Sequence, residues 1–129
     1  MKRIDIHTSN KEEIIDITKE IIESIDIEDG FVYIYCPHTT AGITINENYD
    51  PTVKDDVIKS LNDIVKELES FRHMEGNSTA HMKSILTGKT LQIAVEGGKL
   101  VLGRWDGIYF CDYDGPRKRH ILIKTQEAP

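Results

Sequence analysis

Apolar residues alternate with polar ones in several short runs, and this period of two predicts β-strands. The first run covers residues 2–8, and two more, at 31–36 and 42–46, flank a loop that begins with Pro37. From residue 90 onward the pattern is β to the end of the chain. The strands expected there are 91–95, 100–103, 108–113 and 121–124, with turns at Gly97-Gly98 and at Asp114-Gly115-Pro116.

Two longer segments carry apolar residues at helical spacing. In residues 10–26 the spacing is marked by Ile14 and Ile21, and Ser9 followed by Glu12 matches a capping box. The pattern predicts an amphipathic helix over residues 10–26.

A second helix is predicted from Asp50-Pro51, because Asp50 can cap free N–H groups and Pro51 suits the first helical position. We expect its apolar stripe to pack on the core, and the residues of that stripe are Val53, Val57, Leu61, Ile64 and Leu68. Residues 70–80 predict a loop, followed by a short helix at about 79–86.

Strands and helices are mixed along the chain, and the C-terminal half has the pattern of an antiparallel meander. We therefore predict an α+β fold. The expected architecture is a single domain, residues 1–129, with one large, mixed and mostly antiparallel β-sheet and two main helices. Because such a sheet leaves edges and one face to protect, we expect an oligomer that covers them.

Composition narrows the class of protein. The chain contains 16 Lys and Arg against 22 Asp and Glu, a formal net charge of −6, which argues against a general nucleic-acid binder and a membrane-surface protein. No apolar run approaches the ~20 residues of a membrane span, and no signal-peptide core follows the first residues. We expect a cytoplasmic protein whose two cysteines, Cys36 and Cys111, are buried thiols.

The loop at residues 37–42 joins two predicted strands and contains His38, Thr39, Thr40 and Gly42. An imidazole, two hydroxyls and a glycine that allows close approach suit a ligand or metal site at the end of a sheet. The alternative is a turn whose hydroxyls satisfy local backbone groups.

A second polar cluster follows the long predicted helix and contains His73, Glu75, Asn77 and His81. Neutral imidazoles are common ligands of zinc and related divalent ions, and His38 would complete a three-histidine site with a position open for water or substrate. The spacing of the two histidines is not that of a fixed metal motif, so a polar surface loop is the alternative.

Catalytic roles can be assigned in the same cluster. Glu75 lies between the two histidines and is the best candidate for a general acid or base, although it could also pair with Arg72 at the surface. With His81 and Lys83 it forms the predicted catalytic group. Lys83 would meet an anion at the mouth of the pocket, and an ordinary exposed lysine is the alternative.

Three features outside these clusters could contribute. Glu47, where a predicted strand meets a helix, could orient a histidine. Arg104, next to Trp105, could bind an anion. The basic run at 117–120 could be a phosphate patch, although the sequence favours a solvated hairpin tip, and we interpret His120 as structural.

Taken together, several motifs resemble the YjbQ family, also called the secondary thiamine-phosphate synthase family, over essentially the whole chain. The matching residues are His38-Thr39-Thr40-Ala41-Gly42-Ile43, Asn46-Glu47-Asn48-Tyr49-Asp50-Pro51, His73, Glu75-Gly76-Asn77, Ala80-His81-Met82-Lys83, Trp105, Gly107-Ile108-Tyr109 and Cys111. Separate motifs in the right order are far more specific than any one of them.

The resemblance implies a small α+β fold that assembles as a homotrimer, and a polar pocket around His38, His73 and His81 where a divalent metal can bind. The activity attached to the family is weak thiamine-phosphate synthase, which joins a pyrimidine diphosphate to a thiazole phosphate and releases pyrophosphate. The residues expected to hold the phosphates of a small phosphorylated metabolite are Thr39, Thr40, Asn77 and Arg104.

Two other functions stay open. A three-histidine site prefers zinc, manganese, iron or nickel, which suits a metal-dependent hydrolase or phosphatase, whereas magnesium would arrive with a diphosphate substrate. The third hypothesis is a non-catalytic trimeric protein that binds a metabolite or a metal.

Overall fold

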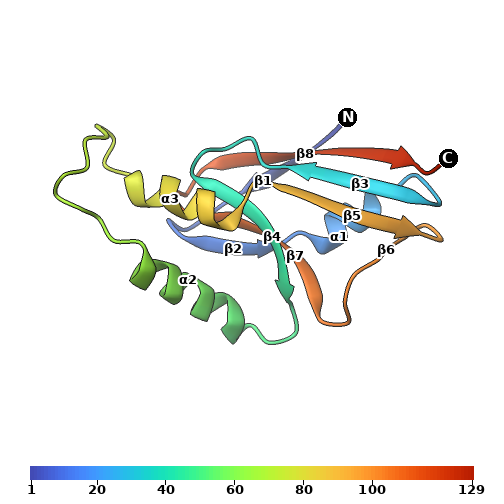
Figure 1. Ribbon diagram of the computed structural model, residues 1–129, viewed down its shortest axis with the longest axis horizontal. Helices are drawn as coiled ribbons and strands as arrows, with labels where there is room; N and C mark the ends of the chain where they lie inside the picture. The colour runs from blue at the N-terminus through green and yellow to red at the C-terminus, as the bar shows by residue number, and fades with distance from the viewer.

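The computed structural model describes residues 1–129 and contains eight strands and three helices (Figure 1). In chain order the elements are β1 (Lys2–His7), β2 (Glu13–Asp16), α1 (Thr18–Glu23), β3 (Gly30–Tyr35), β4 (Ala41–Glu47), α2 (Thr52–Ile64), α3 (Ser78–Thr87), β5 (Thr90–Glu96), β6 (Lys99–Leu100), β7 (Asp106–Asp112) and β8 (Lys118–Glu127). The predicted α+β class is confirmed.

The strands form two antiparallel sheets, so the single large sheet of the prediction is divided. One has the order β1-β8-β3-β5-β6 and the other the order β2-β7-β4. Their facing sides enclose the main hydrophobic core. In β3, for example, Val32 and Ile34 are buried in this core, whereas Tyr33 and Tyr35 point to the outer face, as the period of two requires.

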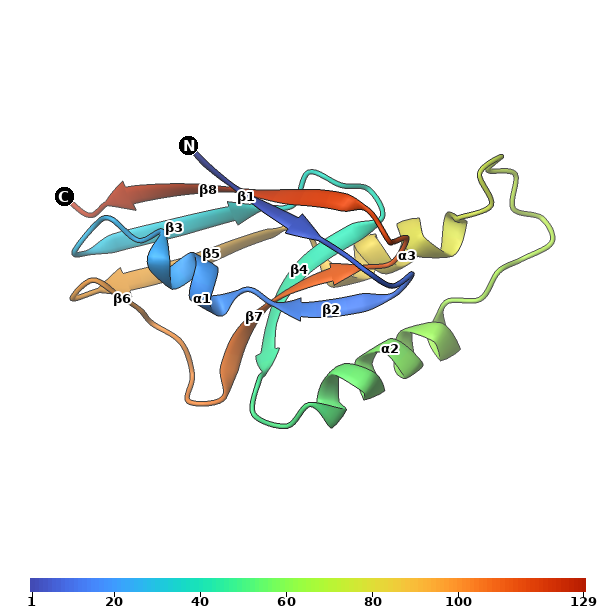
Figure 2. The same cartoon turned by 180° about the vertical axis from the view of Figure 1, so that it is seen from behind.

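The three-stranded sheet is buried on both faces along its central strand, β7. Ile108 and Phe110 belong to the core between the sheets, whereas Tyr109 and Cys111 pack on the other side with Ala80 of α3. The helices α2 and α3 lie on that second side, which gives the molecule three layers (Figure 2).

Residues 10–26 do not form the single helix that their spacing predicts. The segment contains β2, which pairs with β7, and α1, which is only six residues long. The Asp16 carboxylate accepts a hydrogen bond from the first amide of α1 at 2.9 Å, and the Ser9 amide bonds Glu13 at 2.7 Å instead of Glu12. β-Branched isoleucines favour a strand where a neighbouring strand is available. Tertiary pairing therefore overrides the helical spacing.

The start of α2 confirms the predicted cap, because the Asp50 carboxylate accepts a hydrogen bond from the Thr52 amide at 2.9 Å. The helix ends before Leu68, which is 52% exposed. No residue of α2 is fully buried, but Leu61 packs against the buried cluster around Tyr109. The predicted packing of the apolar stripe is therefore confirmed in part, and Ile64, which is 69% exposed, does not take part in it. α3 forms where the short helix is predicted, whereas β6 is shorter than the strand expected at 100–103.

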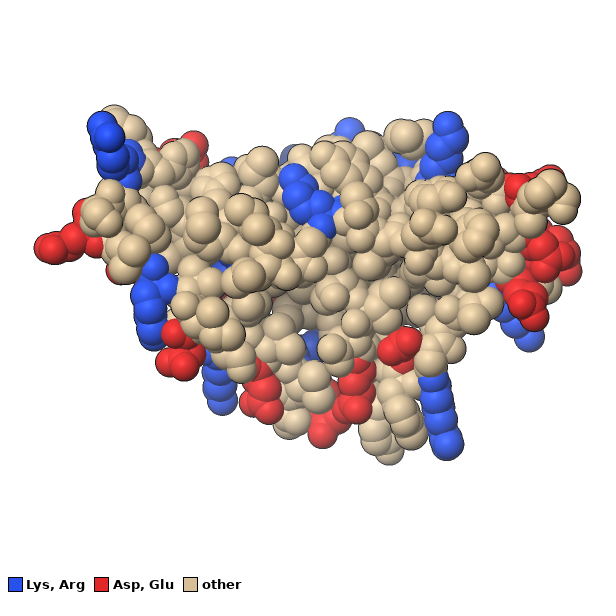
Figure 3. All heavy atoms as spheres, viewed as in Figure 1, with Lys and Arg blue, Asp and Glu red and all other residues tan.

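On the face shown in Figure 3, acidic and basic side chains are interspersed along the rim and form no continuous basic surface. Both cysteines are free and buried, as predicted. None of the three helices has the length and apolarity needed to cross a bilayer.

Candidate functional site

A polar pocket of about 320 Å³ opens where the 37–40 loop, the segment before α3 and the start of β8 meet. Its lining residues are Pro37, His38, Thr39, Thr40, His73, Glu75, Asn77, His81, Arg117 and Arg119. Two clusters that are far apart in the sequence, the 37–42 loop and the 73–81 segment, thus share one cavity.

The ring of His81 has a defined orientation in this pocket. Its Nδ1 lies 3.1 Å from the carbonyl oxygen of Thr39, and because a carbonyl cannot donate, the proton is on Nδ1. In the neutral imidazole the other ring nitrogen, Nε2, then has the lone pair that a ligand would use. The ring of His73 packs edge-on against that of His81, with 5.0 Å between ring centroids. These two imidazoles are the nitrogen ligands that the pocket offers.

His38 lines the pocket but differs from the other two histidines. Its Nε2 lies 3.0 Å from both the backbone nitrogen and the carbonyl oxygen of His120, so this ring atom is engaged in either tautomer. Burial, assisted by the nearby charge of Arg119, holds the pKa of His38 below its ordinary value. No group of three or more His, Cys, Asp or Glu side chains is arranged to hold a metal ion. The structure thus brings the three predicted histidines into one pocket without assembling the three-histidine metal site.

A buried ion pair supports one wall of the pocket, which Arg119 lines. Arg119 is 5% exposed and Asp112 is fully buried, and their side chains make two contacts, Nη2–Oδ1 at 2.7 Å and Nε–Oδ2 at 3.1 Å. Arg119 Nη2 also donates to the Thr40 hydroxyl at 2.8 Å. Burial would raise the pKa of Asp112, but hydrogen bonds from Arg119 and Thr8 hold it below its ordinary value. The guanidinium is consequently a fixed cation.

A second, more exposed ion pair lies at the rim. Arg117 Nη2 is 2.8 Å from a carboxylate oxygen of Asp114, and the same oxygen accepts a hydrogen bond from Asn77 Nδ2 at 2.8 Å. Because this contact fixes which side of the amide is nitrogen, Asn77 Oδ1 is identified as the acceptor, and it is buried without a hydrogen-bond partner. Such an orphan oxygen indicates a missing donor or cation. Glu75 is exposed beside it, with 3.5 Å between its Oε2 and Asn77 Nδ2.

Lys83 is outside the pocket, so its predicted place at the pocket mouth is wrong. It is 5% exposed and its Nζ lies 2.8 Å from Glu12 Oε2, with a further hydrogen bond to Asn62 of α2. Two residues along a helix turn the side chain by about 200°, which explains why Lys83 points away from the face that carries His81.

Glu47 and Arg104 also lie outside the pocket. The Glu47 carbonyl accepts a hydrogen bond from the Tyr109 hydroxyl, and its side chain orients none of the histidines. The Arg104 guanidinium stacks on Trp105 at 4.7 Å from the ring centroid. The predicted second-layer role of Glu47 and the predicted anion-binding role of Arg104 are therefore not supported by the geometry.

The sequence interpretation missed Arg119, which it assigned to a solvated hairpin tip. A signal was present, because Arg119 precedes Ile121 and Ile123 at a spacing of two and therefore shares their inward face. Asp112 has the same relation to Phe110 and Ile108 in β7. A charged residue in register with a buried face of a strand requires a buried partner, and each of these residues supplies it for the other.

Comparison with known proteins identifies relatives of this chain. A family model described as UPF0047 protein YjbQ-like matches residues 2–128. The UPF0047 protein YugU of Bacillus subtilis is 50% identical over 128 residues, which cover 96% of this chain and 97% of that protein. A UPF0047 protein of Methanocaldococcus jannaschii is 48% identical over 125 residues, covering 95% of this chain and 91% of its own.

Solved structures agree with these matches. An uncharacterised YjbQ/UPF0047 protein of Clostridium acetobutylicum superimposes with a TM-score of 0.94 at 44% identity, covering 98% of this chain and 100% of that one. A conserved hypothetical protein of Thermus thermophilus gives a TM-score of 0.92 at 37% identity, with the same coverage. By sequence and by fold, therefore, the chain belongs to the UPF0047, YjbQ-like family.

Proposed function

We propose that the polar pocket binds a small phosphorylated metabolite. The observation that carries this proposal is the fixed guanidinium of Arg119, which forms a wall of a cavity lined by polar and charged groups. Its Nε and Nη2 are held by Asp112 and Thr40, so the N–H groups of Nη1 are the ones left for a phosphate oxygen, and their orientation is set before a ligand arrives. Arg117 at the rim and the Thr39 and Thr40 hydroxyls offer further donors to the same anion.

The proposal includes a divalent transition-metal ion, and the residues present fit one. His81 Nε2 and Asn77 Oδ1 both lack a protein partner, and the His73 ring lies beside His81. Two imidazoles and an amide oxygen are an acceptable donor set for zinc or manganese. His73, His81 and Asn77 would hold the ion, whereas the Nε2 of His38 is engaged with the backbone of His120. When bound, the ion would supply a Lewis acid that polarises a phosphoryl oxygen.

The reaction best supported is hydrolysis of a phosphate monoester. A water oxygen attacks phosphorus, the bond from phosphorus to the ester oxygen breaks, and the products are inorganic phosphate and an alcohol. Glu75, exposed at the pocket edge, takes the proton from the attacking water and returns it to the leaving oxygen. Arg117 and Arg119 stabilise the charge on the phosphoryl oxygens.

Thiamine-phosphate synthase chemistry is the second candidate. The two arginines favour it, because a departing pyrophosphate carries more charge than a single phosphate. That reaction must also hold two heteroaromatic rings. Apart from Pro37 and the three imidazoles, the lining has no ring or aliphatic side chain to pack against them, so hydrolysis ranks first.

Metal content and turnover test the proposal. The protein is loaded with Zn²⁺ or Mn²⁺, dialysed and analysed by mass spectrometry, alongside the double variant His73→Ala/His81→Ala and the control His7→Ala on an exposed strand position. We expect about one ion per chain in the wild type and the control, and none in the double variant. Equal metal in all three proteins would overturn the metal site.

Glu75→Gln separates an enzyme from a binding protein. Phosphate release is measured from a panel of small phosphate esters, and binding of inorganic phosphate by ³¹P NMR. Loss of turnover with phosphate binding retained supports the hydrolase. Phosphate binding without turnover in either form would leave a metabolite-binding protein.

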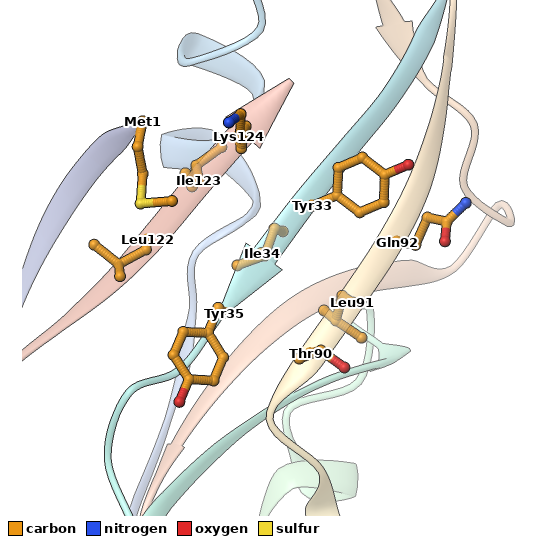
Figure 4. A pocket seen from close by; sticks show the side chains of 10 residues that line it. All are labelled: Met1, Tyr33, Ile34, Tyr35, Thr90, Leu91, Gln92, Leu122, Ile123 and Lys124. Atoms are coloured by element: carbon orange, nitrogen blue, oxygen red, sulfur yellow. The ribbon is translucent and has the colours of Figure 1, made fainter. Parts of the chain in front are cut away.

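We also propose the homotrimer that the family resemblance implies. The outer face of the five-stranded sheet supports it, with a mostly apolar groove that contains Tyr33, Tyr35 and Leu122 (Figure 4). The three aromatic side chains of β3 that point outward are 36–44% exposed. Other copies of this chain are the proposed occupants, since aromatic side chains gathered on one face mark an interaction surface. Sedimentation equilibrium should give a trimer mass that Tyr33→Lys reduces to that of the monomer.

A further inference from the structure

An apolar cavity lies beneath α2, on the opposite side of α3 from the polar pocket. Its volume is about 210 Å³, and seven of its ten lining residues are hydrophobic. They come from β2, β4, α2, α3 and the β7 strand with the residue after it, and they include Leu61, Leu86, Tyr109, Cys111 and Tyr113. Figures 1 and 2 both show α2 as an outlying layer beside the three-stranded sheet.

Polar contacts hold α2 over this cavity. Near its C-terminal end, Asn62 bonds Glu12 at 2.9 Å and accepts a hydrogen bond from the buried Lys83, which itself pairs with Glu12. Near its first turn, Lys54 Nζ lies 5.2 Å from the centroid of the Tyr109 ring. With both ends fixed in this way, the apolar middle of the helix stays half-buried and leaves space beneath it.

The walls define the chemistry of a ligand. No charged residue lines the cavity, so a charged ligand would lose its hydration without a partner. Burial raises the pKa of Cys111 to about 12, which keeps this thiol neutral as well. Tyr109 and Tyr113 present ring surface, and Thr44 and Asn46 place polar groups at the solvent side.

The volume of the cavity limits which uncharged molecules could bind. Protein interiors are close-packed, and apolar cavities of roughly 150 Å³ accept a benzene ring. A cavity of about 210 Å³ has room for one ring with a substituent. We propose that this cavity is a binding site for an uncharged, single-ring aromatic molecule whose one hydrogen-bonding group faces Thr44 and Asn46.

The site is independent of the proposed function. His81 points from α3 to the polar pocket, whereas Leu86 and Thr87 of the same helix line the apolar cavity. Removing the metal or the phosphate ligand should leave aromatic binding intact, so each proposal can fail without the other.

Benzyl alcohol is the probe, followed by methyl and amide chemical shifts in two-dimensional NMR of the full chain. We expect a saturable shift of Leu61 and Leu86 with a Kd on the order of 1 mM, as suits a ligand of eight heavy atoms. At ten times the Kd the Tm should rise by about 5 °C. Intermolecular NOEs should join the ring protons to Tyr113.

Leu61→Trp fills the cavity and should abolish this binding. Ile64→Trp on the same helix is the matched control, because Ile64 is 69% exposed and does not line the cavity. If Leu61→Trp does not fold, the NOEs in the wild type decide alone. The proposal would be overturned by an absent or unsaturated response in the wild type, or by equal binding in both tryptophan variants. It would also be overturned if dilution of the protein alone shifted the same signals, because another copy of the chain would then cover this face.

Discussion

Asp112 is fully buried, yet both of its carboxylate oxygens are bound by one side chain, that of Arg119. The pair joins the end of β7 to the start of β8 and carries the only strongly buried cation that lines the polar pocket. Asp112→Asn leaves Arg119 buried beside a neutral amide. We expect the free energy of unfolding at pH 7 to fall by about 3 kcal/mol, measured by urea denaturation. Asp63→Asn, in an exposed pair with Lys66, should change it by less than about 0.5 kcal/mol.

The Asp112 carboxylate should also make the free energy of unfolding fall in acid. Its folded pKa is below the ordinary value of 3.8, so the folded protein binds fewer protons than the unfolded chain in this range. The contribution of the pair is therefore fully present above pH 3.8 and is lost as the pH falls through the folded pKa. The urea midpoints of wild type and Asp112→Asn, measured from pH 7 to pH 2.5, should differ by a constant amount down to about pH 3.8 and approach each other below it. A constant difference down to pH 2.5 would contradict this assignment.

Arg117 is expected to set phosphate affinity without supporting the fold, because it is exposed and pairs with Asp114 at the rim. Arg117→Ala should weaken the binding of inorganic phosphate about tenfold, in line with the loss of one charge-assisted hydrogen bond. Calorimetric titration measures the Kd. Lys118→Ala, the neighbouring exposed cation that does not line the pocket, is the control and should bind phosphate normally.

Lys83 should affect stability and not ligand affinity. Lys83→Met removes the cation that joins Glu12 to Asn62, and we expect a loss of about 3 kcal/mol in the free energy of unfolding. Phosphate and metal binding by the folded variant should be unchanged. If the variant bound phosphate tenfold more weakly at wild-type stability, Lys83 would belong to the ligand site, contrary to the structure.

His81 provides a prediction about the imidazole orientation. His81→Gln keeps a polar side chain but removes the Nε2 ligand, so Zn²⁺ affinity should fall at least 100-fold with a small change in Tm. Competition with a chromophoric chelator measures the metal affinity. His38→Gln should retain metal and lose stability, since the His38 ring binds the backbone of His120. The reverse pattern would exchange the roles of the two histidines.

The sequence was sufficient for those parts of the fold that depend on local signals. Alternation in β3, the Asp50 cap of α2 and the position of α3 all follow from neighbouring residues. The segment at 10–26 failed because its strand exists only through pairing with β7, a contact between residues about 95 positions apart. The division of the strands into two sheets also depends on pairing between distant segments, so the local pattern does not predict it.

Contacts between distant residues also limit what the sequence predicts about the candidate site. Its histidines were recognisable because they gather in two polar segments, and the structure places both segments on one cavity. Ligand geometry was not recognisable, since the engagement of His38 depends on the backbone of His120, which lies 82 positions away. Likewise, the partner that makes a buried Arg119 tolerable is on another strand.

One wall of the pocket comes from the final strand, because β8 supplies both Arg119 and the backbone group that holds His38. During synthesis the 37–40 loop and α3 emerge long before β8, and the sheet between β1 and β3 lacks its middle strand until then. All three histidines are therefore synthesised before Arg119, which follows His81 by 38 positions. The proposed ligand binding would therefore require the end of the chain, and a chain cut before residue 118 should lack it.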